Sequence, residues 1–496
     1  MEQKAKLRAE ALKEKLHNND DIILREISLP LFCGVLMFLD EIVDTKEINT
    51  NIIKPLIEFC DKVNGRVDEK LLLTKLSVVC EIEAFKTEKD IAEKLFKGFA
   101  VLYVDGVESA ICFNVAKFNN RAIMEPPTSM VIKGPREGFT ENIKINLGLI
   151  RKRLITDDLK IESFVVGEKT QTQVKLVYLV SVADDKVVKK IREKINTLTV
   201  DGIVDSYYMK KILEDRPNSI FKQIGDTEKP DICCAKILEG RIAIFVDGSP
   251  IVLTIPFLLM EDLQSSNDYY SEAHRATVLR ILRLFAAIGT ILLPGFYIAM
   301  QLFHYKVLPL KFLITIVNTT QNLPLNPLLE ILFIMVLFEI LFEASIRMPK
   351  YLGVAISIVG ALILGDTAVK AGLVSPPGVM IVAISAITVY TIPDQSTQVS
   401  LLRIIFAFIG GILGFQGLIL AGMFMVAYLA KLDSFGTPYL APCAPFVFSD
   451  QKDFLIKEVF TEMQKQPKGF PNKGGIRQKY ENKEKGGKEE WWKVWI

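Results

Sequence analysis

Charged side chains are scarce over a long stretch of this 496-residue chain. The sequence holds 60 Lys and Arg against 58 Asp and Glu, yet only 11 of these charges fall within residues 284–430. A single soluble globule does not distribute its charge so unevenly, which excludes that class. Uncharged runs at 284–303, 371–393 and 404–430 each have the length that a helix needs to cross a bilayer. We therefore expect an integral membrane protein with a large soluble portion in front.

Cysteine and histidine are also few. The seven cysteines show no CxxC spacing, which argues against a disulfide framework and against a zinc site. The three histidines lie in separate segments without an HExxH, GxSxG or GxGxxG motif. We expect no catalytic residue, no metal, no cofactor and no enzymatic activity. The balanced charge says little about partners, and no nucleic-acid partner is expected. The charge-rich first 20 residues lack an apolar core and predict no cleavable signal peptide.

The soluble portion contains one internal repeat. The segments GFAVLYVDG and GRIAIFVDG start at Gly98 and Gly240, and each places an apolar strand before an Asp-Gly turn. Because Asp-Gly tolerates positive φ, each segment predicts a β-hairpin. Between them the pattern predicts helices at 141–154, 183–197 and 206–214 and a strand at 173–180.

The predicted fold class is an α/β cytosolic region of two subdomains followed by an α-helical transmembrane domain of four to six membrane segments. The expected divisions are a charged N-terminal helix (1–20), two α/β cytosolic subdomains (21–135 and 136–270), a helical membrane domain (271–448) and a polar cytosolic tail (449–496).

A glycine-containing loop, residues 134–140, precedes the predicted helix at 141–154. Free backbone N–H groups at a helix N-terminus can bind an anion. The alternative is an ordinary loop capped by Thr140, with Arg136 and Glu137 paired locally. Short glycine motifs occur often by chance, which favours the ordinary loop.

The topology of the helices follows from their flanks. Arg275, Arg280 and Arg283 precede the first run, and the chain from Asp450 onward carries 11 Lys and Arg with 8 Asp and Glu. Such flanks are typical of the cytoplasmic side, so both ends are expected there and the number of crossings should be even. Clear crossings are expected at 284–303, 328–345, 376–393 and 404–430, and less certain ones at 312–329 and 351–365.

Charges inside the apolar region are the strongest functional signal, because a buried charge in a bilayer is costly. Glu339, Glu343 and Arg347 recur every four residues and are expected to form one intramembrane charge stripe on a helix. The stripe fits either an ion-pair ladder between helices, or a wall of an ion pathway or a partner contact. Glu330 falls on another side of the same helix, near its start, and is expected at the membrane interface.

Small residues suggest a pore and a packing site. Residues 357–367 mix small and polar side chains with apolar ones, and an acidic residue at one end suits a cation path. A packed interior helix with a loop carboxylate is the alternative. Gly410 and Gly414 form a GxxxG pair that permits close helix packing, within or between subunits. The pore or gate candidates are Ser357, Val359, Gly360, Leu362, Asp366 and Thr367.

The residues from about Asp20 to Phe448 resemble the A subunit of the spore germinant receptors, the GerA family of endospore-forming Firmicutes. The order and spacing of several segments carry the resemblance. They are NNDDIILREISLP, MEPPTSMVIKGPREGFTENIKINLGLIRKRL, IFVDGSPIVLTIP, LLPGFYIAMQLFHYKVLP, LFEILFEASIRMPKYLG, LGDTAVKAGLVSP, TIPDQS and LDSFGTPYLAPCAPF.

The resemblance implies a multi-pass protein of the spore inner membrane whose N-terminal region and tail are cytoplasmic. It implies a homo-oligomer, expected to be a pentamer, that forms a cation channel opened when nutrient binds a transporter-like B subunit. A lipoprotein C subunit and membrane lipid are further implied partners. A non-conducting scaffold, and the stage V sporulation paralogue that accompanies the dipicolinate-release channel, are the alternatives.

Overall fold

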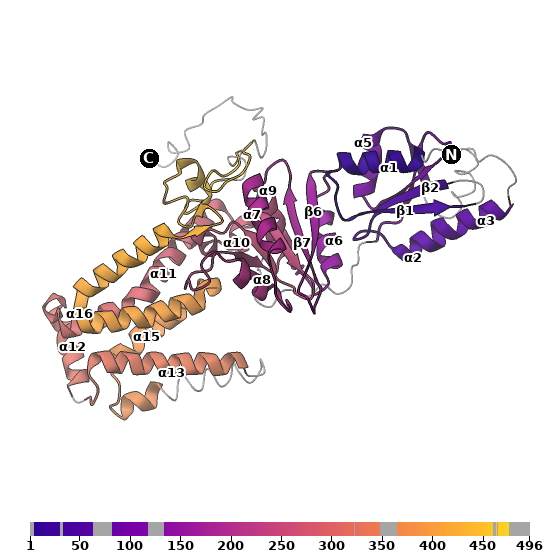
Figure 1. Cartoon of the computed structure of the whole chain (residues 1–496). Coiled ribbons are helices and arrows are strands. Elements are labelled where there is room, and N and C mark those ends of the chain that lie inside the picture. Colours follow the sequence, from indigo (N-terminus) through magenta and orange to yellow (C-terminus); the bar gives the residue numbers. More distant parts are fainter. Residues whose placement is uncertain are drawn as a thin grey trace.

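The computed structural model describes most of the chain, and Figure 1 shows its arrangement. The described residues are 4–29, 33–62, 82–117, 133–321, 323–347, 365–459, 463 and 465–475. Two α/β subdomains come first, a bundle of long helices follows, and the segment after the last helix lies back against the second subdomain. The two subdomains that the sequence predicts are therefore present.

The first subdomain is built on a five-stranded antiparallel sheet with strand order β1-β2-β4-β5-β3. Its single core is filled by the apolar residues of the strands and of the helices beside them. The strands are β1 (Ile22–Ser28), β2 (Cys33–Leu39), β3 (Ile82–Phe85), β4 (Phe99–Val104) and β5 (Ala110–Asn114), and the helices are α1 (Lys4–Lys15), α2 (Thr45–Glu47), α3 (Lys54–Lys62) and α5 (Glu88–Phe96).

The N-terminal helix α1 belongs to this core although its sequence is dense in charge. Ala5, Ala9 and Leu12 are buried on one face, and the helix packs on β2 and β4. The Ala5 backbone N–H also donates to Asp105 at 2.8 Å, in the predicted Asp-Gly turn. Spacings of four and three residues put these small apolar side chains on one helix face, which explains the docking.

The second subdomain repeats the same architecture with strand order β6-β7-β9-β10-β8. Successive residues of β9 point into two separate cores, one under α7 and α8 and the other under α6 and α9. The strands are β6 (Leu159–Val166), β7 (Thr172–Leu179), β8 (Gly225–Thr227), β9 (Ile242–Val246) and β10 (Val252–Ile255), and the helices are α6 (Ile143–Arg153), α7 (Asp185–Asn196), α8 (Ser206–Leu213) and α9 (Pro230–Leu238).

The predicted repeat is confirmed by this topology. GFAVLYVDG supplies β4 and GRIAIFVDG supplies β9, and these strands hold the same central place in their sheets. The predicted helices at 141–154, 183–197 and 206–214 and the strand at 173–180 are also present, with ends shifted by a few residues.

The helical region consists of helices that run to and from the α/β region (Figure 1). In the described chain, α11 and the helix over Pro393–Lys431 are long and apolar enough to cross a membrane, with mean hydropathies of 1.9 and 2.3. The helices are α10 (Ser266–Tyr269), α11 (Ala273–Leu302), α12 (Leu310–Thr320), α13 (Pro327–Arg347), α15 (Pro376–Val389) and α16 (Ser396–Lys431).

Helix α16 reverses direction at Gly414, which adopts φ 62° and ψ −152°. Gly414 lies beside Phe303 at the far end of α11. Both ends of α16 return to the second subdomain, because Gln395 binds Asp262 and the Tyr428 hydroxyl binds Ser219. The sequence predicts one crossing over 404–430, and that prediction is wrong. Left-handed backbone suits glycine, and it turns the run into two antiparallel arms.

The segment after α16 packs on the second subdomain. A short hairpin of β11 (Asp433–Ser434) and β12 (Thr437–Pro438) follows the helix. Further on, Asn472 forms a bridge with Ala183, and the Lys473 backbone N–H donates to the Val182 carbonyl at 2.8 Å. The described part of the tail and the second subdomain thus lie on one side of the helices.

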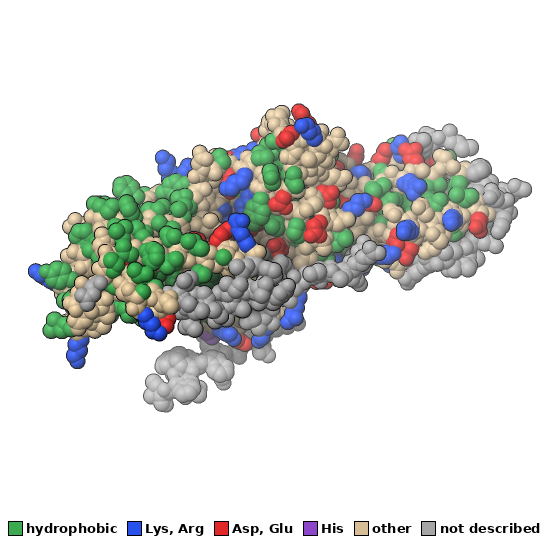
Figure 2. Space-filling model, turned by 90° about the horizontal axis from the view of Figure 1, so that it is seen from below, with side chains coloured by type: hydrophobic (Ala, Val, Ile, Leu, Met, Phe, Trp, Pro, Cys, Tyr) green, Lys and Arg blue, Asp and Glu red, His purple; other side chains and the backbone are tan. Residues whose placement is uncertain are grey.

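Apolar and charged side chains occupy different regions of the surface, as they occupy different regions of the sequence. Figure 2 shows hydrophobic side chains covering the helical region, whereas acidic and basic side chains gather over the α/β region. Many apolar residues of α11, α13 and α16 are exposed, such as Phe285, Ile340 and Phe424. An apolar surface of this extent is typical of a protein that contacts lipid.

Candidate functional site

The junction between the second subdomain and the helices is held by a buried polar cluster. The Lys222 ammonium lies 2.8 Å from Asp262, and the Gln395 side chain donates to the same carboxylate at 2.6 Å. All three side chains are buried. Burial raises the pKa of Asp262 to about 6, although Lys222 and Gln395 act in the opposite direction. Gln395 belongs to the loop between α15 and α16, so this cluster ties that loop to the α/β region.

A second cluster fixes the start of α11. Arg280 and Arg283 both bind Asp268, at 3.3 and 2.7 Å. Arg280 also donates to the carbonyl and the carboxylate of Asp453, at 2.8 and 3.1 Å. Two of the three arginines that the sequence analysis assigns to a membrane flank are therefore bound to carboxylates of the chain itself.

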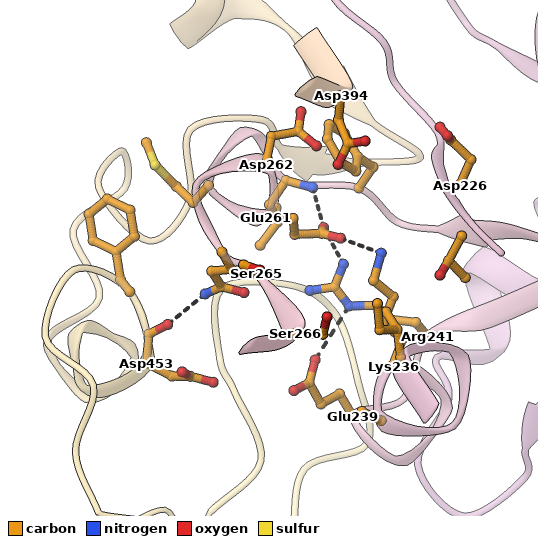
Figure 3. Close-up of a pocket in the computed structure, with 18 of the residues that line it drawn as sticks. Asp226, Lys236, Glu239, Arg241, Glu261, Asp262, Ser265, Ser266, Asp394 and Asp453 are labelled. Atoms are coloured by element: carbon orange, nitrogen blue, oxygen red, sulfur yellow. Dashed lines mark hydrogen bonds and ion pairs between the residues drawn. The ribbon is translucent and has the colours of Figure 1, made fainter. Parts of the chain in front are cut away.

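A cavity of about 1640 Å³ lies at this junction, between the second subdomain, the loop before α16 and the tail. Figure 3 shows Arg241 between Glu261 and Glu239, with Asp262 and Asp394 also lining the cavity. Lys236 binds Glu261 at 2.8 Å. Burial alone would raise the pKa of Glu261, but Arg241 and Lys236 outweigh it and lower that pKa to about 2. The charged side chains at this end of the cavity are thus paired with one another.

The predicted charge stripe is divided between two environments. Glu343 and Arg347 pair with each other at 2.5 Å on the exposed face of α13. Glu339 instead reaches Arg403 of α16 at 3.3 Å. The Arg403 side chain is 2% exposed, and its Nε and Nη1 atoms have no hydrogen-bond partner among the described residues. Glu339 therefore links two helices, whereas the other pair stays within one helix.

Sequence reasoning missed Arg403, because it stands just before the uncharged run at 404–430. A comparison of how far charged residues lie along neighbouring helices could have found it. Arg403 lies eight residues from Gln395, and Glu339 lies eight residues from Arg347, so each is about 12 Å from the end of its helix near the junction. Opposite charges at equal depth on neighbouring helices predict a pair.

Glu330, which the sequence predicts at the membrane interface, is buried among the helices at 1% exposure. Its Oε1 accepts hydrogen bonds from the backbone N–H and the hydroxyl of Ser375, at 2.7 and 2.5 Å. Ser375 is the N-cap of α15. The sequence of α13 predicts the direction in which Glu330 points from the helix axis. It does not predict which face of α13 is covered by α15, so it could not predict that Glu330 is buried.

Four of the six pore candidates lie outside the described residues, namely Ser357, Val359, Gly360 and Leu362. Asp366 is described, in a helical segment at 365–370, where it pairs with Lys370 at 2.6 Å. Thr367 is exposed in the same segment. Both partners of the Asp366 pair are exposed as well.

The glycine pair on α16 has two different environments. A Cβ on Gly410 would lie 2.4 Å from the Gly295 carbonyl oxygen of α11, so the two helices approach at these glycines. Gly414 instead occupies the reversal of α16. The close approach is therefore made within one chain, and it involves Gly410 with Gly295.

Residues of the glycine loop at 134–140 bond to other residues of the chain. The Phe139 backbone N–H donates to the Glu228 carbonyl at 2.8 Å, and Glu137 pairs with Arg153. Asn142, rather than Thr140, caps α6 by accepting from the Lys144 backbone N–H at 2.9 Å. This arrangement is an ordinary helix start, without a free nest of N–H groups.

Apolar helices that carry a few paired charges, joined to two α/β subdomains, define a membrane-associated protein. A family model described as "Bacillus/Clostridium GerA spore germination protein" matches residues 10–469. The chain belongs to this family.

Several curated proteins are similar over most of their length. Spore germination protein KA of Bacillus subtilis (strain 168) is 34% identical, over 94% of this chain and 86% of that protein. The uncharacterized membrane protein YfkQ of the same organism is also 34% identical, over 94% and 93%. Spore germination protein GerLA of Bacillus cereus is 30% identical, over 90% and 91%.

A solved structure is similar in sequence to part of the chain. It is the N-terminal domain of the A subunit of the Bacillus megaterium spore germinant receptor GerK3, at 29% identity. The match covers 49% of this chain and 91% of that one, with a TM-score of 0.39.

Proposed function

We propose that this protein is the A subunit of a nutrient germinant receptor in the spore inner membrane, a receptor subunit and not an enzyme. Copies of it would assemble, as a pentamer, into a nutrient-gated cation channel whose opening triggers germination. Its partners would be a transporter-like B subunit, a lipoprotein C subunit and membrane lipid. Membership of a family of spore germination proteins supports the receptor role.

The observation that most favours a channel is the charge on the exposed face of α13. The side chains of Glu339, Glu343 and Arg347 are 43%, 58% and 78% exposed in the single chain, on an otherwise apolar helix. Of these residues Glu339 lies well inside the helix, where a charge facing lipid costs about 2.5–3.5 kcal/mol, whereas Glu343 and Arg347 lie near its end. Protein from another copy, or water in a pore, would remove that cost.

The course of the helices supports a cytoplasmic location for the α/β region and the tail. The tail packs on the second subdomain, and both ends of α16 do the same. An even number of crossings satisfies this geometry. Five crossings are available, namely α11, α13, α15 and the two arms of α16. An even number then requires one more, which we assign to the apolar stretch 351–365 of the sequence. The same stretch holds four of the six proposed gate residues, Ser357, Val359, Gly360 and Leu362.

The experiment that tests the proposal is cation flux through the purified protein in liposomes, measured with and without its B and C subunits. We expect nutrient-dependent release of monovalent cations in the complete complex. Replacing Glu343 by Leu should reduce flux or assembly at least tenfold, because it removes a charge from the shared face.

Ile340→Leu is the matched control, since Ile340 is an exposed apolar residue of the same face. It should leave flux and assembly unchanged. Absence of flux from a fully assembled complex would replace the channel by a non-conducting scaffold.

A further inference from the structure

Glu330 is a carboxylate buried among apolar helices without a counter-ion. It lies in the first turn of α13, next to the buried Ile331 and near Ile334. No Lys, Arg or His forms an ion pair with it in the part of the chain that the structure describes. Its two hydrogen bonds both come from Ser375, at the start of α15. An ionised carboxylate in such a place needs further compensation.

The side chains around Glu330 include polar groups that the chain does not satisfy. Tyr297 is 6% exposed, and its hydroxyl faces Glu330, Ser375 and Gln301. That hydroxyl has no hydrogen-bond partner of good geometry among the described residues, and neither amide atom of Gln301 has one. Tyr297 and Gln301 are one turn apart on α11, so both project toward the same place. Buried polar groups of this kind can accept a further partner, such as water or an ion.

The cluster collects oxygen atoms from three helices at the end of the bundle away from the α/β region. A carboxylate, two hydroxyls and one amide carbonyl are the ligands that hard cations such as K⁺ and Na⁺ prefer. Its formal charge is −1, which one monovalent cation neutralises and a divalent cation exceeds. The positive end of α15 faces the same carboxylate, so the cation would be held weakly.

We propose that Glu330, Tyr297, Gln301 and Ser375 form a binding site for a monovalent metal cation at the outer end of the membrane helices. This inference deepens the proposed channel function and rests on it, since the site would hold a cation of the kind that the channel conducts. Weak binding suits that role, because an ion that conducts must also leave.

The test measures thermal unfolding of the full chain, purified in detergent. KCl or NaCl replaces choline chloride at constant ionic strength and constant pH, because choline is too large for the site. For the wild type we expect K⁺ or Na⁺ to raise the unfolding midpoint by about 2–4 °C. Glu330→Gln should abolish the rise.

Tyr297→Phe is the sharper variant, because its hydroxyl has no partner to lose. It should be as stable as the wild type in choline chloride and should show at most half of the cation-dependent rise. Tyr305→Phe is the control, since it removes the hydroxyl of an exposed tyrosine just after α11, and it should keep the full rise.

Two results would overturn the site. One is a midpoint that does not depend on K⁺ or Na⁺. The other is a full rise in Tyr297→Phe. Liposome flux is measured separately, so a cation-dependent rise without flux would refute the channel and keep the site, whereas flux without the rise would refute the site alone.

Discussion

The two α/β subdomains share one strand order but hold different neighbours. In the described residues, the first subdomain meets only the second, through contacts such as the Arg151–Asp21 ion pair at 2.6 Å. The second also meets the helices at Gln395, Tyr428 and Lys431. The same fold thus serves once as an end domain and once as a link. Within the described residues, a change in the helices reaches the first subdomain through the second.

The largest effect is expected at the seam between the subdomains. Asp21 and Arg151 have side-chain exposures of 0% and 1%, so Asp21→Ala leaves a buried guanidinium without its carboxylate. Breaking a buried pair in this way costs about 3–5 kcal/mol. Chemical denaturation of the purified protein should show this loss as an earlier unfolding transition.

The exposed pair Lys144–Asp40 crosses the same seam and supplies the control. Asp40→Ala should cost less than about 1 kcal/mol. Equal losses for the two variants would mean that the seam does not depend on the buried pair.

The next effect concerns the link to the helices. Gln395→Leu removes the side chain that donates to Asp262, and a hydrogen bond to a charged group contributes about 1.5–3 kcal/mol. We expect the unfolding midpoint to fall and nutrient-dependent flux to become uncoupled from the α/β region. Gln398→Leu, in the first turn of α16 beside the cavity, is the matched control and should change neither quantity.

Much of the α/β region was predictable, because strand and helix periodicities are local properties of the sequence. The β4 and β9 hairpins followed from their Asp-Gly turns. The helical region was harder, because a run such as 404–430 is apolar on all sides and fits one long helix as well as two arms. Only the φ of Gly414 decides between them. The burial of Glu330 and the Arg403 partner of Glu339 depend on which helices become neighbours, and a single helix pattern does not contain that information.

A third prediction distinguishes the seam from the junction by pH. Burial, with a further contribution from Asp21, raises the pKa of Glu41 at the seam to about 8 from an ordinary 4.5. The folded state therefore holds a proton that the unfolded state has lost, and stability falls as pH rises from about 4.5 to 8. Glu261 at the junction has its pKa lowered to about 2, so its contribution is present above pH 4.5 and is lost as pH falls from about 4.5 to 2.

Glu41→Gln should therefore flatten the fall in stability toward pH 8, and Glu261→Gln should flatten the loss below pH 4.5. The change should amount to at most about 5 kcal/mol for Glu41 and at most about 3 kcal/mol for Glu261, measured by denaturation at a series of pH values. Opposite slopes in these two windows would contradict the assignment of the two groups.

The smallest effect is expected where the tail meets the second subdomain. Asn472 of the tail forms a β-bridge with Ala183 there. In the first subdomain, Ala116 forms the corresponding bridge with Val43, so a residue of that subdomain takes the position that the tail takes in the second. Lys473 adds an ion pair to Asp185 at 2.8 Å, but Asp185 is 80% exposed. Exposed pairs contribute about 0–1 kcal/mol, whereas the backbone hydrogen bond from Lys473 to Val182 does not depend on the Asp185 side chain. Asp185→Ala should therefore leave the tail docked, and limited proteolysis after Asp450 should be as slow as in the wild type. Faster cleavage in this variant would mean that the surface charge, and not the backbone pairing shared by the two subdomains, holds the tail in place.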